Sequence, residues 1–306
     1  MNTYSPEGRI YMTHRNTEIL NSPKLLEAAF ESGSILEATA VLCDAQHNLI
    51  VDIPNAKAVI PRAKGALGIE DGSTRDIAIL SKVNKPVCFI IENISIDEKG
   101  MRSYTLSRLA AQQRCMNEYI SMLNKGDIIK ARVTHLEPFG AFVDIGCGIP
   151  SLIPIDAISV SRISHPNDRF YNGQDIFAVV KDIQENRIYL SHKELLGTWE
   201  ENRNMFHIGE TVPGIVRSVE NYGIFIELAP NLAGLAEPRE NVHAGQSAVV
   251  NIKAMIPEKM KIKLGIVDVF DTPQNSRKMN YFLTAGNLKR WVYSPENCRK
   301  EIISEF

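Results

Sequence analysis

Hydrophobic and polar residues alternate with a period of two in several short segments of this chain, as they do in half-buried β-strands. In one segment the apolar residues are Ile129, Ala131 and Val133, which are expected to face a core. The intervening Lys130 and Arg132 are expected outside, where contact with phosphate is an alternative to ordinary solvation. Four more such strands follow, separated by turns that contain Gly and Asn. Five short strands are too few for two packed sheets, so the pattern predicts a small closed barrel.

The strand pattern repeats along the chain. Residues 126–142 align without a gap on residues 209–225, and each copy carries a glycine between two aromatic residues. A more divergent copy spans residues 33–107 and lacks the aromatic pair, with His47 and Ile50 near the two positions. Three barrels are therefore expected.

The predicted fold is mainly β, with three tandem five-stranded barrels of the OB type joined by short helices and followed by a C-terminal β-β-α extension. The expected domains are an N-terminal segment with a short helix (1–32), a degenerate barrel (33–107), a helical linker (108–124), the best-preserved barrel (125–191), a second helical linker (192–207), a third barrel (208–270) and an extension packed on the third barrel (271–306).

Capping signals place the short helices. Ser22 is a suitable N-cap for a helix that begins at Pro23. Ser191 and Glu194 have the spacing of a capping box, which predicts one helix from there to about residue 204. Trp199 is expected to pack this helix against a barrel. In the tail, strands are expected at residues 279–285 and 288–293, and a helix at residues 295–303.

Composition and charge narrow the class of protein. Hydrophobic residues make up 44% of the chain and charged residues 23%, as in ordinary globular proteins. The first residues have no signal pattern and no apolar stretch is long enough to cross a bilayer, so we expect a cytoplasmic protein without a membrane partner. Residues 126–250 carry 10 Lys+Arg against 16 Asp+Glu, whereas residues 251–306 carry 10 against 6. Nucleic-acid binding by the acidic part would therefore be modest and would depend on local basic residues and stacking.

The cysteines and the motif content give no sign of catalysis. The five cysteines are scattered and include no Cys-x-x-Cys pair, which disfavours a disulfide framework and a structural zinc site. Histidine–glutamate zinc motifs and phosphate-binding glycine loops are absent from the sequence. We expect no enzymatic activity, no cofactor, no metal and no small-molecule substrate.

Two aromatic residues flank a glycine in the best-preserved copy, in the order Phe139-Gly140-Ala141-Phe142. The alternation places Ala141 and Val143 inside the barrel and Phe142 outside. An outward aromatic ring on a β surface is typical of proteins that stack on unpaired nucleic-acid bases. The alternative is that both rings cap the barrel core, and the alternation favours binding.

Residues 125–195 resemble the S1-type RNA-binding domain, which is named after the multi-repeat ribosomal protein S1 of bacteria. The matching motifs are Gly126-Asp127, Phe139-Gly140-Ala141-Phe142-Val143-Asp144, Ser151-Leu152-Ile153 and Arg187-Ile188-x-Leu190-Ser191. Residues 209–265 resemble the same domain less closely, and residues 33–107 less again. The resemblance implies an OB barrel whose second and third strands present the face that binds nucleic acid.

The resemblance also implies roles for individual residues. In the family two aromatics stack on bases, a basic residue on the last strand contacts phosphate, and a histidine after the third strand assists. The best-preserved barrel matches these positions with Phe139, Phe142 and Arg187, while Pro154 replaces the histidine. The third barrel matches them with Tyr222, Phe225 and Lys261. Its Glu237 replaces the histidine, which predicts weaker RNA binding there.

The first barrel keeps neither aromatic and has Ser103 at the basic position. It resembles early repeats that the family uses to dock on protein.

Two other candidate residues, in a loop and in the tail, are less specific. His165 lies in a long loop beside Arg162 and Arg169, where it is either an ordinary loop residue or part of an RNA groove. Trp291, which follows two basic residues, either packs on the third barrel or contacts RNA.

The leading hypothesis is therefore a protein that binds single-stranded RNA, including messenger RNA, and acts in translation. The small ribosomal subunit is a candidate partner. The alternative is an adaptor whose barrels dock on a ribosomal or transcription protein, and the acidic middle of the chain favours it.

Overall fold

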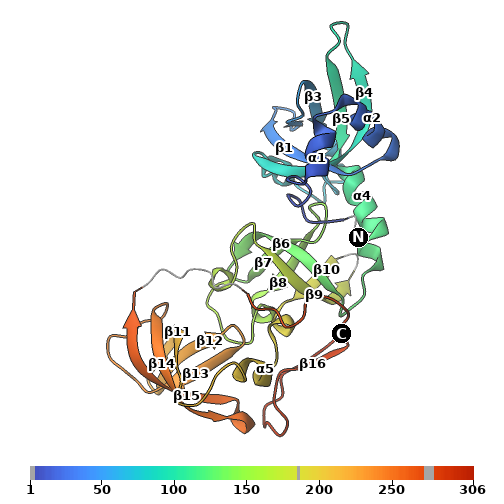
Figure 1. The fold of residues 1–306 in the computed structure, drawn as a ribbon. Helices are drawn as coiled ribbons and strands as arrows, with labels where there is room; N and C mark the ends of the chain where they lie inside the picture. The colour runs from blue at the N-terminus through green and yellow to red at the C-terminus, as the bar shows by residue number, and fades with distance from the viewer. Residues whose placement is uncertain (1–3, 185–186, 272–278) are drawn as a thin grey trace. The chain divides into compact units, whose positions relative to one another are not determined.

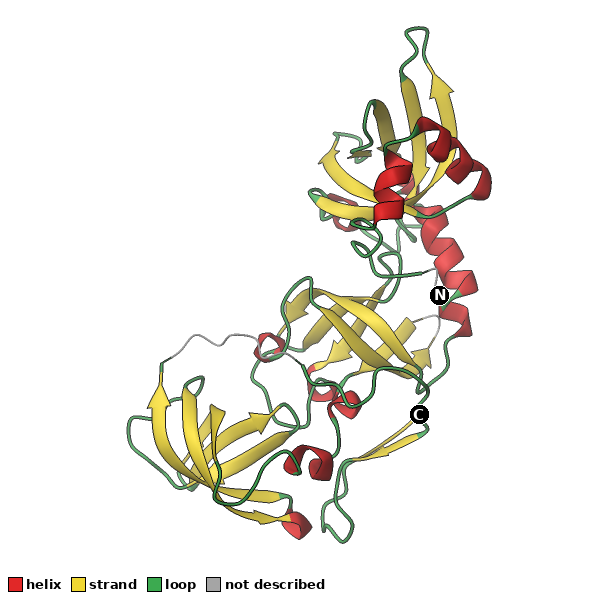
Figure 2. Ribbon diagram, viewed as in Figure 1, coloured by secondary structure: helices red, strands yellow, loops and turns green. Residues whose placement is uncertain are grey.

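The structure is a computed structural model that describes residues 4–184, 187–271 and 279–306. Strands dominate and helices are few, which confirms the predicted mainly β fold (Figure 2). The strands form three closed five-stranded barrels (Figure 1). The chain divides into two compact units: one is Met1–Leu123 with Asp144–Pro150, and the other is Asn124–Val143 with Ser151–Phe306. Within the described residues, no helix has the length and apolar character needed to cross a membrane.

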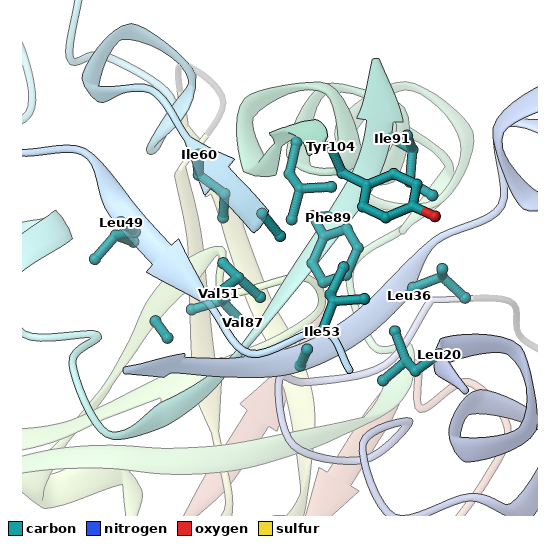
Figure 3. Close-up of a cluster of buried hydrophobic side chains, with 14 of the residues drawn as sticks. Leu20, Leu36, Leu49, Val51, Ile53, Ile60, Val87, Phe89, Ile91 and Tyr104 are labelled. Atoms are coloured by element: carbon teal, nitrogen blue, oxygen red, sulfur yellow. The ribbon is translucent and has the colours of Figure 1, made fainter. Parts of the chain in front are cut away.

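The first unit is built on one barrel, in which the strands neighbour one another in the order β1-β2-β3-β5-β4. Its strands are β1 (Leu36–Cys43), β2 (Leu49–Val51), β3 (Ala56–Ile60), β4 (Lys85–Ile96) and β5 (Arg102–Ser107). Apolar side chains from all five strands meet in its core, together with Leu20 of a preceding helix (Figure 3). Phe89 and Tyr104 are the largest of them and are fully buried.

Short helices surround this barrel. They are α1 (His14–Leu20), α2 (Pro23–Ser32), η1 (Arg62–Lys64), α3 (Ile77–Leu80), α4 (Arg108–Glu118) and η2 (Ile120–Met122). The cap predicted for α2 is confirmed, because the Ser22 hydroxyl accepts a hydrogen bond from the Leu25 N–H and Pro23 occupies the first turn. The sequence reasoning missed α1, which is capped by Thr13, and α3, which lies in an insertion.

A buried charge cluster holds the N-terminal segment in the first unit. The Glu7 carboxylate accepts hydrogen bonds from Arg108 Nε at 2.6 Å and Lys82 Nζ at 2.7 Å. The Glu7 N–H donates to Asp144 Oδ2 at 2.7 Å. Burial alone would raise the pKa of Glu7, but the two cations outweigh it and hold the pKa well below its usual range. Glu7 is therefore ionised and paired.

Glu37 is a second buried carboxylate of this unit. One of its oxygens accepts backbone N–H bonds from Gly8 at 3.0 Å, Ile10 at 3.0 Å and Tyr11 at 2.7 Å. Its other oxygen, Oε1, has no hydrogen-bond partner among the described residues. Burial, followed by the nearby Glu7 carboxylate, raises the pKa of Glu37 to about 7.

Glu37 is expected to make the stability of the first unit depend on pH. Because its pKa in the folded state lies above the usual 4.5, the folded state binds the proton more tightly. Stability should therefore rise as the pH falls through 7, by on the order of 3 kcal/mol when complete. Glu37→Gln keeps an oxygen for the three N–H groups but cannot titrate. Between pH 8 and pH 5, the melting temperature of this variant should therefore rise less than that of the wild type. Parallel pH profiles for the two proteins in calorimetry would contradict this expectation.

The second unit contains the other two barrels, which share the strand order of the first. The second barrel comprises β6 (Ile128–Glu137), β7 (Gly140–Asp144), β8 (Pro150–Pro154), β9 (Asp175–Gln184) and β10 (Arg187–Ser191). The third barrel comprises β11 (Thr211–Glu220), β12 (Gly223–Ala229), β13 (Leu232–Ala236), β14 (Ser247–Ile256) and β15 (Lys261–Phe270). Ile129, Ala131 and Val133 are buried as the alternation predicted.

Buried ion pairs connect the second and third barrels. Arg169 precedes β9, and its guanidinium pairs with Glu227 of β12 at 2.5 Å, with both side chains 2% exposed. Arg217 of β11 pairs with the same carboxylate at 2.7 Å and with Asp168 at 3.0 Å. The Asn231 side chain also accepts from the Val160 N–H at 2.9 Å.

The linker between these barrels corrects one prediction. Instead of one helix from Ser191, the structure has a short 3₁₀ helix η5 (Lys193–Leu196) and a separate helix α5 (Trp199–Arg203). Gly197 lies between them with φ at +82°, a left-handed conformation that interrupts a helix. The capping box is formed by Thr198 and Glu201. Trp199 is buried in the core of the third barrel, as expected.

The C-terminal extension also differs from the prediction. The β-β part is present, but its strands are β16 (Arg290–Val292) and β17 (Ile303–Glu305), which pair antiparallel. The predicted strand at residues 279–285 and the predicted helix at 295–303 do not form. The Ser294 hydroxyl donates to the Lys300 carbonyl and accepts from the Ile302 N–H, which closes the connection as a loop. Strand pairing therefore replaces the local helical preference.

The extension contacts both barrels of its unit. Trp291 and Tyr293 are buried in the core of the third barrel. The Leu288 N–H donates to the Gly126 carbonyl at 2.8 Å, beside the second barrel. The Tyr281 ring packs edge-on against Phe177 of β9 at 5.2 Å, and its hydroxyl lies 3.0 Å from His192 Nε2. Contact with the second barrel was not predicted.

Candidate nucleic-acid interface

The glycine between the paired aromatics has a steric function. A Cβ atom at Gly140 would lie 2.5 Å from the Ile153 carbonyl oxygen, and one at Gly223 would lie 2.6 Å from the Ala236 carbonyl oxygen. Both distances are shorter than real contacts allow, so only glycine lets the third strand approach here. The aromatic-glycine-x-aromatic motif is therefore a packing requirement of the barrel as well as a surface feature.

The aromatic pair of the second barrel lies on its outer surface. Phe139 is 56% exposed and Phe142 is half-buried. The two rings meet edge to face with centroids 5.9 Å apart. Tyr222 and Phe225 of the third barrel repeat this arrangement at 6.1 Å, and Tyr222 is 69% exposed. Neither pair caps a barrel core.

Strand register extends each pair into a row of outward side chains. In the third barrel Ser218 of β11 lies opposite Phe225 of β12, which lies opposite Leu235 of β13. Leu235 in turn neighbours Lys263 of β15. We call these four positions, and the corresponding positions in the other two barrels, the transverse row. The row crosses four strands on the outside of the barrel.

By sequence alignment with the third barrel, the transverse row of the second barrel consists of His135, Phe142, Leu152 and Tyr189. Tyr189 neighbours Leu152 in the parallel pair of β10 with β8. The His135 ring stacks on Phe142, with centroids 6.4 Å apart and planes 27° apart, and its side chain is 60% exposed. His135 Nε2 also lies 2.6 Å from Glu137 Oε1. This row presents three rings, and Phe139 beside it makes a fourth.

His135 and Tyr189 were missed by the sequence reasoning. The alternation of β10 was available as a signal, since the flanking Ile188 and Leu190 are apolar and prove to be buried. The signal did not identify Leu152 as the neighbour of Tyr189, because the two strands are distant in sequence.

The transverse row of the first barrel has no aromatic member. It consists of Leu42, Ile50, Val59 and Thr105, which neighbour one another in that order across β1, β2, β3 and β5. His47, which the sequence places near the first aromatic position, pairs with Asp76. Its Nδ1 lies 2.7 Å from Asp76 Oδ2. The first barrel therefore offers an aliphatic surface where the second offers rings.

The predicted basic residues of the second barrel differ in their surroundings. Arg187 at the start of β10 and Lys130 on β6 are exposed. Arg132 is engaged within the barrel, because its Nε donates to the Gly173 carbonyl at 3.0 Å and lies 3.5 Å from Asp175. Of the two basic candidates on β6, Lys130 is exposed, whereas Arg132 is partly buried.

The loop and tail candidates have structural roles. His165 caps the 3₁₀ helix η4 (Pro166–Asp168), where its Nδ1 accepts from the Asn167 N–H at 3.1 Å. Arg169, which the sequence placed beside a possible groove, is buried against Glu227. Trp291 is 6% exposed, so the packing alternative is correct for it.

The two remaining candidates of the third barrel, Lys261 and Glu237, are both exposed.

Comparison with known proteins confirms the resemblance. Residues 122–193 match the family model described as the S1 RNA binding domain. The chain is 28% identical over 279 residues to small ribosomal subunit protein bS1 of Staphylococcus aureus strain COL, an alignment that covers 85% of this chain and 68% of that protein. It is 27% identical over 286 residues to the protein of the same name from Rhizobium meliloti strain 1021. This chain spans 48% of the length of the Rhizobium protein.

Similar solved structures include a multidomain protein with nucleic acid binding domains from Streptococcus pneumoniae TIGR4. It is 14% identical, covers 79% of this chain and 76% of its own, and has a TM-score of 0.26. Another is GSP13 from Bacillus subtilis, which is 22% identical over 22% of this chain and 55% of its own, with a TM-score of 0.22. At such low TM-scores, neither structure supports a conclusion about this chain.

Proposed function

We propose that this protein binds single-stranded RNA through its second barrel and acts in translation. Unpaired bases would stack on Phe139, Phe142 and the other rings of the transverse row, while Arg187 and Lys130 would contact the backbone. The observation that carries the proposal is the group of four outward rings on one face, since such rings serve as stacking platforms for bases.

The match of residues 122–193 to the S1 RNA binding domain supports RNA as the ligand. The relatives from Staphylococcus and Rhizobium are named as proteins of the small ribosomal subunit, which supports a role in translation and the small subunit as partner. Messenger RNA is the ligand that we propose in this setting.

The adaptor function is the second candidate, and the first barrel favours it. Its transverse row of Leu42, Ile50, Val59 and Thr105 has no ring on which a base could stack. An aliphatic β surface is better suited to a protein partner than to RNA. An adaptor would keep its partner at raised salt and after ribonuclease treatment, whereas RNA binding would weaken steeply with salt.

A titration of the full chain with a short fluorescent pyrimidine RNA tests the proposal. We expect saturable binding to the single strand, weaker binding to a duplex of equal length, and loss of affinity as salt increases. Equal affinity for the two RNAs, or no saturable binding at low salt, would refute base stacking as the mode of recognition.

His135 and Tyr189 are expected to contribute to this binding. Each base–aromatic stack is worth about 1–3 kcal/mol, so His135→Ala and Tyr189→Ala should each weaken binding by about fivefold or more. Tyr189→Phe keeps the ring and should bind like the wild type, which separates stacking from hydrogen bonding by the hydroxyl. Anisotropy titrations measure the effect, and unchanged affinity in both alanine variants would limit the platform to Phe139 and Phe142.

A further inference from the structure

Four exposed lysines gather on the last hairpin of the third barrel. Lys253 lies on β14, Lys261 and Lys263 lie on β15, and Lys259 lies in the connecting 3₁₀ helix η6 (Pro257–Lys259). Among the residues that the structure describes, no carboxylate forms an ion pair with any of the four. We call these four residues the lysine cluster.

The lysine cluster lies on the same outer face as the transverse row. Lys263 is itself the fourth member of that row, next to Leu235. Lys261 precedes it by two residues on β15, and the intervening Ile262 is 1% exposed, so both lysines point outward. Lys253 reaches across to this face, because its Cε lies 2.7 Å from the position of a Cβ at Gly265.

A β-bulge makes the lysine positions comparable among the barrels. In the third barrel Ile252 and Ala254 pair with consecutive residues of β15, so Lys253 is the extra residue. In the second barrel Val180 and Asp182 pair with consecutive residues of β10, which makes Lys181 the extra residue. In the first barrel the extra residue is Glu92, and it pairs with Lys64 at 3.3 Å.

The three barrels differ in charge at equivalent positions. The bulge residue and the two outward residues of the last strand are Glu92, Ser103 and Thr105 in the first barrel, Lys181, Arg187 and Tyr189 in the second, and Lys253, Lys261 and Lys263 in the third. Positive charge therefore increases along the chain, whereas the largest number of rings is in the second barrel. Stacking groups and charges are concentrated on different barrels.

We propose that the third barrel binds the phosphate backbone of single-stranded RNA through the lysine cluster, while the second barrel supplies most of the stacking. The inference rests on the proposed function and assigns a separate part of it to each barrel. Phosphodiester groups are the class of ligand that matches, because four exposed ammonium groups lie along the edge of a β surface that also carries Tyr222 and Phe225. The third barrel is then the principal source of salt dependence.

The salt dependence of RNA affinity distinguishes two hypotheses about the third barrel. In one it binds phosphate through the lysine cluster, and in the other it stacks bases as the second barrel does, but more weakly. On single strands, each neutralised phosphate contributes about 0.7 to the slope of log Kd against log salt. Stacking on neutral rings releases no counterions. Removing lysines should therefore flatten the slope, while removing rings should weaken binding at an unchanged slope.

The test uses the full chain and a short pyrimidine RNA. The variant K253Q/K259Q/K261Q/K263Q should lose about 2–3 units of slope and at least tenfold in affinity at low salt. The control K24Q/K57Q/K85Q/K99Q makes the same change in net charge with four exposed lysines of the first unit. It should keep most of the slope. Replacing the lysine cluster with arginine should restore the wild-type slope and confirm that charge is responsible.

Three results would overturn the inference. One is an unchanged slope in the glutamine variant of the lysine cluster, and another is an equal loss of slope in the control variant. A third is failure of the arginine variant to restore the slope. If Phe139→Ala/Phe142→Ala still weakens binding in those cases, the proposed function stands without this division. If that variant also binds like the wild type, the proposed function fails as well.

Discussion

Replacing Phe139 and Phe142 together with alanine is expected to weaken binding of single-stranded RNA at least about 30-fold. Loss of two stacks removes about 2–6 kcal/mol, and 1.4 kcal/mol corresponds to a tenfold change in affinity. Phe139 is 56% exposed and Phe142 is half-buried, so the barrel should retain its fold. Anisotropy titrations at constant salt measure the change.

Two comparisons make this result specific. Ile208→Ala removes an apolar side chain that is 64% exposed and lies outside the strands, and it should leave RNA affinity unchanged. Tyr222→Ala/Phe225→Ala removes the equivalent pair from the third barrel, where the row has fewer rings and Glu237 is nearby. Its effect should be smaller than that of the second-barrel variant. Equal effects would mean that both barrels stack bases equally well.

Replacing Arg108 with methionine is expected to destabilise the first unit by about 3–5 kcal/mol, because the buried Glu7 carboxylate loses its main partner. Both side chains are nearly inaccessible, at 2% and 6% exposed. Burial lowers the pKa of Arg108, but the Glu7 carboxylate outweighs this effect and raises the pKa above its ordinary value. The charged pair is therefore the stable form. Calorimetry of the full chain should show the loss in the transition of the first unit.

The matched control is an exposed arginine–glutamate pair of the same unit. Arg102 and Glu27 are 28% and 48% exposed, so Arg102→Met should cost less than about 1 kcal/mol. Glu7→Gln/Arg108→Met removes both charges and should be less harmful than Arg108→Met alone. If the single variant at Arg108 costs no more than the control, the cluster does not anchor the N-terminal segment.

Much of the fold could be predicted from local sequence patterns. The alternation around Ile129 and the cap at Ser22 each depend on residues close together in sequence, and both predictions were confirmed. The helix through residues 295–303 was wrong because pairing of β16 with β17 overrides a local preference. Pairing between separated strands leaves little trace in either segment alone.

The candidate site could be predicted only in part from the sequence. Phe139 and Phe142 were found because their motif is contiguous, whereas Tyr189 joins the same face through its neighbour Leu152 on another strand. In the sequence, Arg169 was identified only as a loop residue near His165. Its burial against Glu227 depends on a carboxylate from a different barrel.

Local sequence patterns were sufficient to predict that the chain folds as three small barrels and that the second and third of them carry an aromatic pair. Period-two alternation and tight turns are local properties, and the repeats reinforce them. Which polar and aromatic residues share a surface depends on the pairing of strands that are distant in sequence. Strand register brings His135, Phe142 and Tyr189 onto one face, and it places Lys253 beside Lys263. Packing buries Arg169 against Glu227. It also engages Arg132, which stays partly exposed, with the Gly173 carbonyl and Asp175. These partners are distant in sequence, so the sequence alone does not identify them.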